Sequence, residues 1–123
     1  MISHVSIGVR DLVKAGRFYD TALAALGYKR LYDSTDALGY GEKSPELWVM
    51  KVERPVKPDE ASGLHLCFDA ADRVGVDAFH KAGIKVGGRD NGKPGVRKDY
   101  GYNYYAAFLI DPEGYRLEAY CGR

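Results

Sequence analysis

Hydrophobic and polar residues alternate along two separate stretches of the chain, and each stretch leads into a helical pattern. Between Ile2 and Val9 one face of an extended chain carries mainly apolar side chains, which is typical of a half-buried strand. After Asp11, a good helix N-cap, apolar residues recur at helical spacing as far as Leu26. The same order returns from Gly63 onward. The pattern therefore predicts two strand–helix units.

The second unit repeats the first at a constant offset. Three pairs of identical residues lie 61 positions apart: His4 and His65, Asp11 and Asp72, and Phe18 and Phe79. The offset is close to half of the 123 residues, and two copies are too few for a solenoid. We interpret the chain as one domain, 1–123, that contains a duplicated half-domain.

Each half predicts the order β-α-β-β-β, which makes the fold class α+β. Turn residues separate the expected strands, and a proline-containing connector at 53–62 separates module 1 (about 1–53) from module 2 (about 62–123). After the first strand and helix, module 1 is expected to have strands at 28–32, 37–42 and 46–52. In module 2 the helix is expected to end at Gly83, with strands at 84–86, 104–110 and 115–120 and a long loop at 87–103.

Composition narrows the possible partners. The net charge of +1 and the sequence pI of about 7.7 give no reason to expect nucleic acid or an acidic membrane surface as a partner. No apolar run is long enough to cross a membrane, and the N-terminal residues predict a strand rather than a signal region. Cys67 and Cys121 form no recognisable framework, so a reducing, cytoplasmic setting is expected.

The repeated histidines are the strongest candidates for chemistry. If both modules follow the same path, His4 and His65 occupy corresponding strand positions, and Glu118 in the last strand adds a carboxylate. Two histidines and one carboxylate with open positions suit zinc, iron or another divalent ion. The alternative is structural: His4 as a hydrogen-bonded core or edge residue, and Glu118 as an exposed residue on an edge strand.

Four stretches of the chain resemble the vicinal oxygen chelate superfamily, which includes glyoxalases, extradiol dioxygenases and bleomycin or fosfomycin resistance proteins. They are His4-Val-Ser-Ile-Gly-Val-Arg-Asp11, Phe18-Tyr19 with Leu23 and Gly27-Tyr28, His65-Leu-Cys-Phe68 and Asp111-Pro-Glu-Gly-Tyr-Arg-Leu-Glu118. The resemblance implies paired modules whose mixed sheets curve around a metal held by His4, His65 and Glu118. It also implies a homodimer and a small substrate that binds through two neighbouring oxygens.

One position departs from the lactoylglutathione lyases of that superfamily, which usually carry a fourth ligand, Glu or Gln, on the last strand of the first module. The repeat places that position near Leu47 or Trp48. Glu46 lies at the start of the strand, where a solvated strand end is the preferred interpretation over a ligand. Trp48 is then an apolar wall beside the metal, which weakens the lyase assignment and leaves room for dioxygenase chemistry.

Three functions follow from the resemblance. The first is a lyase or isomerase that depends on zinc, nickel, manganese or iron, with Glu118 as base and Glu46 as the less favoured alternative. The second is an extradiol-type dioxygenase with iron or manganese, and the third is a metal-free protein that binds a drug or metabolite. The expected substrate-binding residues are Trp48, Arg97, Tyr100, Tyr102 and Tyr105. For the stretch 97–105 an ordered surface loop or dimer contact is an equal alternative, and the site is open to assembly within one chain or across a dimer.

Overall fold

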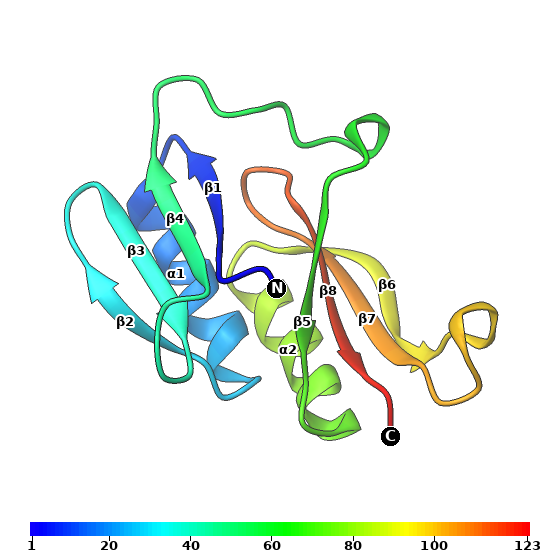
Figure 1. The fold of residues 1–123 in the computed structure, drawn as a ribbon. Helices are drawn as coiled ribbons and strands as arrows, with labels where there is room; N and C mark the ends of the chain where they lie inside the picture. The colour runs from blue at the N-terminus through cyan, green and yellow to red at the C-terminus, as the bar shows by residue number, and fades with distance from the viewer.

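Two four-stranded sheets lie side by side in the computed structural model, which describes residues 1–123 (Figure 1). Module 1 contains β1 (Val5–Val9), α1 (Leu12–Ala24), β2 (Lys29–Asp33), β3 (Ala37–Gly41) and β4 (Leu47–Lys51). Module 2 contains β5 (His65–Asp69), α2 (Arg73–Lys85), β6 (Arg89–Val96), β7 (Tyr105–Ile110) and β8 (Arg116–Cys121). Short 3-10 helices span Glu60–Ser62 and Lys98–Tyr100.

The two modules have the same topology, which confirms the predicted α+β class and the β-α-β-β-β order. The sheet orders are β1-β4-β3-β2 and β5-β8-β7-β6. In each sheet the first strand pairs in parallel with the last strand of its module, and the other pairs are antiparallel. The parallel pairs β1–β4 and β5–β8 therefore lie at equivalent positions.

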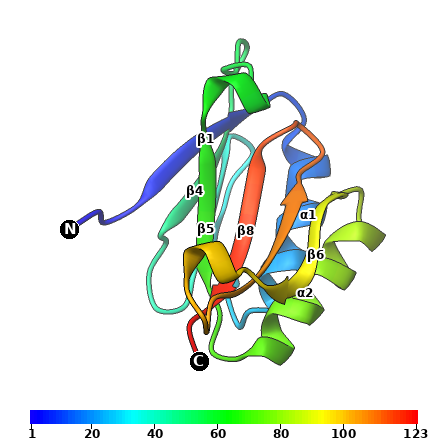
Figure 2. The same ribbon diagram turned by 90° about the vertical axis from the view of Figure 1, so that its right-hand side faces the viewer.

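Local sequence explains where the helices begin and which side they bury. The side chain of Asp11 accepts a hydrogen bond from the N–H of Lys14, which confirms the predicted N-cap, and its repeat counterpart Asp72 does the same for Gly75. The buried side of α1 carries the predicted apolar stripe. Both helices lie on one side of the strands (Figure 2) and contribute to one core cluster of 21 buried residues.

The prediction for the start of module 2's antiparallel strands was wrong. Instead of a short strand at 84–86 and a loop at 87–103, α2 continues to Lys85 and β6 spans Arg89–Val96. The glycines and Pro94 of this segment suggest a loop, but β6 is an edge strand with shifts in its register against β7. An edge strand has one hydrogen-bonded neighbour, so a proline and bulges are tolerated there.

Gly83 lies inside α2 rather than at its end. A Cβ atom at this position would lie 2.3 Å from Cδ1 of Leu109 on β7. Glycine therefore allows the close approach of the helix to Leu109, and it does not terminate the helix.

Long-range hydrogen bonds fix the two modules to each other. The hydroxyl of Tyr19 on α1 donates to Asp111 in the β7–β8 turn at 2.5 Å, and both residues are buried. The hydroxyl of Tyr115, in the same turn, donates to the carbonyl of Gly8 on β1 at 2.6 Å. The backbone N–H of Arg10 donates to Glu113. The turn of module 2 is thus bound to the first strand and helix of module 1.

None of the helices has the length and apolar character needed to cross a bilayer.

Candidate functional site

Each sheet has one face against its own helix and a second face, which we call the open face. On β8, Leu117, Ala119 and Cys121 are buried in the core, so Arg116, Glu118 and Tyr120 lie on the open face of module 2. By the same alternation, His65 and Cys67 lie on the open face of β5, and Ser6 and Trp48 lie on the open face of module 1.

Strand register makes the two open faces comparable position by position. Ser6 pairs with Trp48 across β1 and β4, and Cys67 pairs with Glu118 across β5 and β8. Ser6 and Cys67 are 61 residues apart, like the two histidines. Trp48 is therefore the counterpart of Glu118.

His65 and Glu118 form a close pair on the open face of module 2. Nε2 of His65 lies 2.7 Å from Oε1 of Glu118. The carboxylate belongs to a residue that is only 2% exposed, whereas the His65 side chain is 45% exposed. The pair thus places a buried carboxylate beneath an imidazole that solvent or a ligand can reach.

Tyr104 completes the surroundings of this carboxylate. Its hydroxyl donates to Oε2 of Glu118 at 2.5 Å. Desolvation and the neighbouring Glu118 raise the pKa of Tyr104 well above its ordinary value, so the hydroxyl remains a donor. A partner of this kind orients a carboxylate and leaves its second oxygen for another group.

A thiol and several aromatic rings surround the pair. Partial burial, and next the Glu118 carboxylate, raise the pKa of Cys67 to about 12, so this thiol stays protonated. The Phe108 ring lies 6.3 Å from the His65 ring, and the Tyr104 and Tyr120 rings are 4.2 Å apart. The open face of module 2 therefore contains a buried carboxylate that is surrounded by aromatic side chains.

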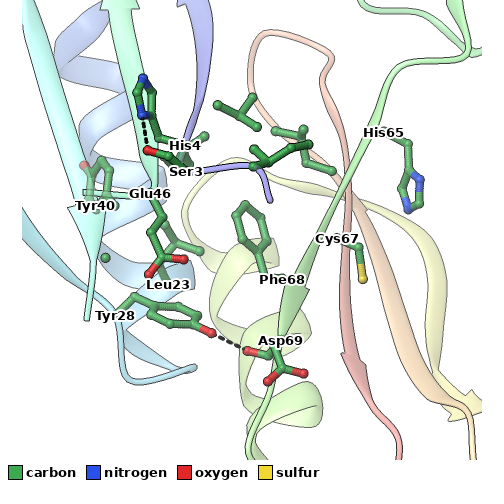
Figure 3. A pocket seen from close by; sticks show the side chains of 15 residues that line it. Ser3, His4, Leu23, Tyr28, Tyr40, Glu46, His65, Cys67, Phe68 and Asp69 are labelled. Carbon is green, nitrogen blue, oxygen red and sulfur yellow. Dashed lines mark hydrogen bonds between the residues drawn. The ribbon is translucent and has the colours of Figure 1, made fainter. Parts of the chain in front are cut away.

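His4 is not part of this group. Its Nδ1 shares a 2.8 Å hydrogen bond with Oγ of Ser3, and its Nε2 makes no hydrogen bond within the chain. Figure 3 shows His4 on the β1 side, whereas His65 and Cys67 project from the opposite side of β5 to Phe68. No three His, Cys, Asp or Glu side chains of the chain lie close enough together to hold a metal ion. One copy of the chain thus brings together two of the three expected ligands.

A cavity of about 410 Å³ lies between the two modules, and both histidines contribute to its walls. Its floor is apolar, with Leu23 and Phe68 among the lining residues. Tyr28 crosses from one module to the other, and its hydroxyl donates to the Asp69 carbonyl at 2.6 Å. Because the His65 imidazole turns toward Glu118 on the far side of β5, this cavity does not join the two histidines into one site.

Trp48 lies on the open face of module 1, where the Tyr32 ring packs against it with centroids 5.2 Å apart. The position that corresponds to Glu118 therefore carries an apolar ring instead of a carboxylate. Glu46 lines the cavity between the modules.

The other expected substrate-binding residues are dispersed. Arg97 stacks over Phe108 at 5.3 Å and donates to the carbonyls of Gly95 and Lys93, while Tyr100 packs against Tyr104. These two residues border the open face of module 2. Tyr102 is 86% exposed. The hydroxyl of Tyr105 donates to Asp77 on α2, so this side chain faces the helix and not Glu118.

Sequence reasoning did not single out Tyr104, Phe108 and Arg116. The alternation of side chains along β7 and β8 could have identified them as residues on the same face as Glu118, because residues two apart share a strand face. Arg116 lies beside His65 in the β5–β8 register.

No protein-family model matches the chain, and no curated protein matches it. Among solved structures, a glyoxalase/bleomycin resistance protein from Albidiferax ferrireducens T118 is 30% identical with a TM-score of 0.81, and the match covers 96% of this chain and 95% of that one. A putative glyoxalase from Bacillus halodurans is 27% identical with a TM-score of 0.74, over 98% and 94% of the two chains. The fosfomycin resistance protein FosX from Mesorhizobium loti has the same fold at 18% identity, with a TM-score of 0.70 and coverage of 100% and 92%.

Proposed function

Because this chain belongs to the glyoxalase/bleomycin resistance protein family, we propose that it is a metal-dependent enzyme of lyase or isomerase type. Its substrate is a small oxygenated molecule that binds the metal through two neighbouring oxygens. The observation that carries the proposal is the 2.7 Å approach of His65 Nε2 to the buried Glu118 carboxylate. A buried carboxylate with an imidazole and a tyrosine hydroxyl on its two oxygens is a typical ligand environment.

The donor set fits a divalent cation. His65 directs Nε2 at Glu118, and His4 has Nε2 free while Ser3 orients the ring through Nδ1. Zinc, nickel, manganese or iron suits two imidazoles and one carboxylate. Such an ion supplies a Lewis acid that stabilises negative charge on the bound oxygens.

The site is assembled from two copies of the chain. The bonds from Tyr19 to Asp111 and from Tyr115 to Gly8 bind the modules together and oppose a movement that would bring His4 to His65. A twofold dimer can instead place the open face of module 1 from one copy over the open face of module 2 from the other. His4 of one copy then joins His65 and Glu118 of the second, and each dimer has two sites.

Within such a site the residues have distinct tasks. Glu118 would hold the metal and would be the base that accepts a proton from the substrate, while Tyr104 keeps one carboxylate oxygen hydrogen-bonded. Trp48 and Tyr32 supply an apolar wall that excludes water from the bound substrate. The protein's free thiols suit a reducing cytoplasm.

Metal analysis after mixing two variants tests the proposal. The wild type is expected to bind about one zinc per chain, and H4A or H65A alone should bind none. Mixed and refolded together, the two variants form mixed dimers with one intact and one doubly damaged site, which restores about one quarter of the wild-type zinc. The third histidine provides the control, H80Q, which keeps full binding.

The outcomes separate the parts of the proposal. Wild-type protein without bound metal would contradict the metal site itself. Full loss in both variants with no recovery on mixing would place each site within one chain.

An extradiol-type dioxygenase is the second candidate, and Trp48 is the observation in its favour. A tryptophan at the counterpart of Glu118 leaves two histidines and one carboxylate, the ligand set of many non-haem iron oxygenases. Oxygen consumption with catechol and ferrous protein would support this candidate, and its absence in iron-loaded protein would remove it. If wild-type protein binds no metal, a metal-free binding protein becomes the leading function.

A further inference from the structure

Arg116 is a charged residue on the open face of module 2 that lacks a counter-ion. It pairs with His65 in the β5–β8 register and lies two residues from Glu118 on the same strand face. None of the ion pairs of the chain includes it. Its Nε is the one buried side-chain nitrogen or oxygen atom without a hydrogen-bond partner.

An unpartnered donor of this kind requires an explanation, because burying a charged donor without an acceptor is unfavourable. Paired N–H groups of a guanidinium match the two oxygens of a carboxylate. Nε of Arg116 is buried, but its two terminal nitrogens are not and make no hydrogen bond within the chain, so they remain available for a planar oxyanion.

The second arginine at this face, Arg97, differs from Arg116 in this respect. Its two terminal nitrogens donate to the carbonyls of Lys93 and Gly95, and the guanidinium lies over the Phe108 ring. These donors are thus used to bind the backbone of β6. Arg116 is therefore the better anchor for an external anion.

We propose that Arg116 binds a carboxylate of the ligand whose neighbouring oxygens reach the His65–Glu118 pair. This inference rests on the proposed function and narrows its substrate to anionic molecules. The rings of Phe108, Tyr104 and Tyr120 that surround the pair favour a flat, aromatic body between the chelating oxygens and the carboxylate. The ligand class is an aromatic compound with two vicinal oxygens and a separate carboxylate.

Two probes that differ by one carboxylate test the proposal: catechol and 3,4-dihydroxybenzoate, titrated calorimetrically into the zinc-loaded dimer. Wild-type protein is expected to bind 3,4-dihydroxybenzoate about 10- to 100-fold more tightly, the usual effect of a charge-assisted pair. R116M should lose this preference, keep its affinity for catechol and keep its zinc content. R116K should retain part of the preference. The matched control R73M, on α2 at the opposite side of the sheet, should retain all of it.

Three results would overturn the proposal: wild-type protein without the preference, R116M that retains it, or loss of the preference in R97M instead. Weaker dimerisation of R116M with the preference intact would identify Arg116 as an intersubunit residue and also count against it. Failure of the metal site would appear separately, as wild-type protein that binds no zinc. The same two probes are then titrated into zinc-free protein, where the preference for the carboxylate is still expected.

Discussion

Replacing Tyr19 by phenylalanine should test how the two modules are held together. Asp111 accepts from the Tyr19 hydroxyl on one carboxylate oxygen and from three backbone N–H groups, those of residues 113–115, on the other. Tyr19 is 0% and Asp111 2% exposed. Y19F leaves the first oxygen buried without a donor, whereas the second keeps all of its partners.

The expected loss follows from this geometry. A hydrogen bond to a charged group contributes about 1.5–3 kcal/mol, and a buried charged acceptor left without its donor adds a desolvation penalty. We expect Y19F to lower the free energy of unfolding by about 3 kcal/mol, with an unchanged dependence on urea concentration. For a chain of this length the midpoint of thermal unfolding should fall by roughly 10 °C. Y105F, which removes an exposed hydroxyl–carboxylate pair with Asp77, is the control and should lose less than about 1 kcal/mol.

The penalty should also depend on pH. Burial raises the pKa of Asp111 above its ordinary value, and the hydrogen bonds from Tyr19 and the backbone only partly offset this effect. The folded state therefore holds the proton more tightly than the unfolded state. The contribution of Asp111 to stability is therefore largest below its unfolded pKa and is lost as pH rises through its folded pKa. Loss of the hydroxyl raises the folded pKa further, so Y19F should be more destabilised at pH 7 than at pH 4. Urea titrations that give equal penalties at both pH values, or a penalty no larger than that of Y105F, would refute this reasoning.

Three further changes have defined outcomes. Y104F removes the hydroxyl from Glu118 and should weaken zinc binding by about 10- to 100-fold in a chelator competition assay, and unchanged affinity would exclude an orienting role. W48E places a carboxylate at the counterpart of Glu118 and should strengthen zinc binding by about tenfold in the same assay, and weaker binding would contradict the shared site. G83A brings a methyl group against Leu109 and should destabilise the fold by about 1–2 kcal/mol in urea, whereas a more stable variant would show that the contact can relax.

The repeat in the sequence was sufficient to predict the architecture, because identical spacing in both halves implies equivalent strands. It also predicted the faces correctly, since alternation on β5 and β8 puts His65 and Glu118 on one side. Local sequence patterns could not predict the edge strand β6. β6 consists of residues that usually form loops, and only its pairing with β7 makes it a strand.

The separation of His4 from His65 could not be predicted from the sequence either. The repeat suggests that equivalent histidines converge, but convergence depends on how the modules are docked. That docking depends on Tyr19 with Asp111 and Tyr115 with Gly8, contacts between residues 92 and 107 positions apart. Local periodicity carries no information about such pairs, so the candidate ligands could be named from the sequence, whereas the separation of His4 from His65 could not be predicted.

The two open faces have one residue type in common and differ at the other positions compared. Histidine stands at the same position in both, whereas Trp48 corresponds to Glu118 and Ser6 to Cys67. Module 2 thus carries the carboxylate and Arg116, and module 1 contributes an imidazole and an aromatic wall. Under the proposed pairing of modules from two copies, the metal would have charged partners on one side and apolar ones on the other. A ligand in such a site has only one favourable orientation, with its chelating oxygens at the metal and its carboxylate toward module 2. The duplication accounts for the scaffold, and under the proposed function the differences between its halves would orient the substrate.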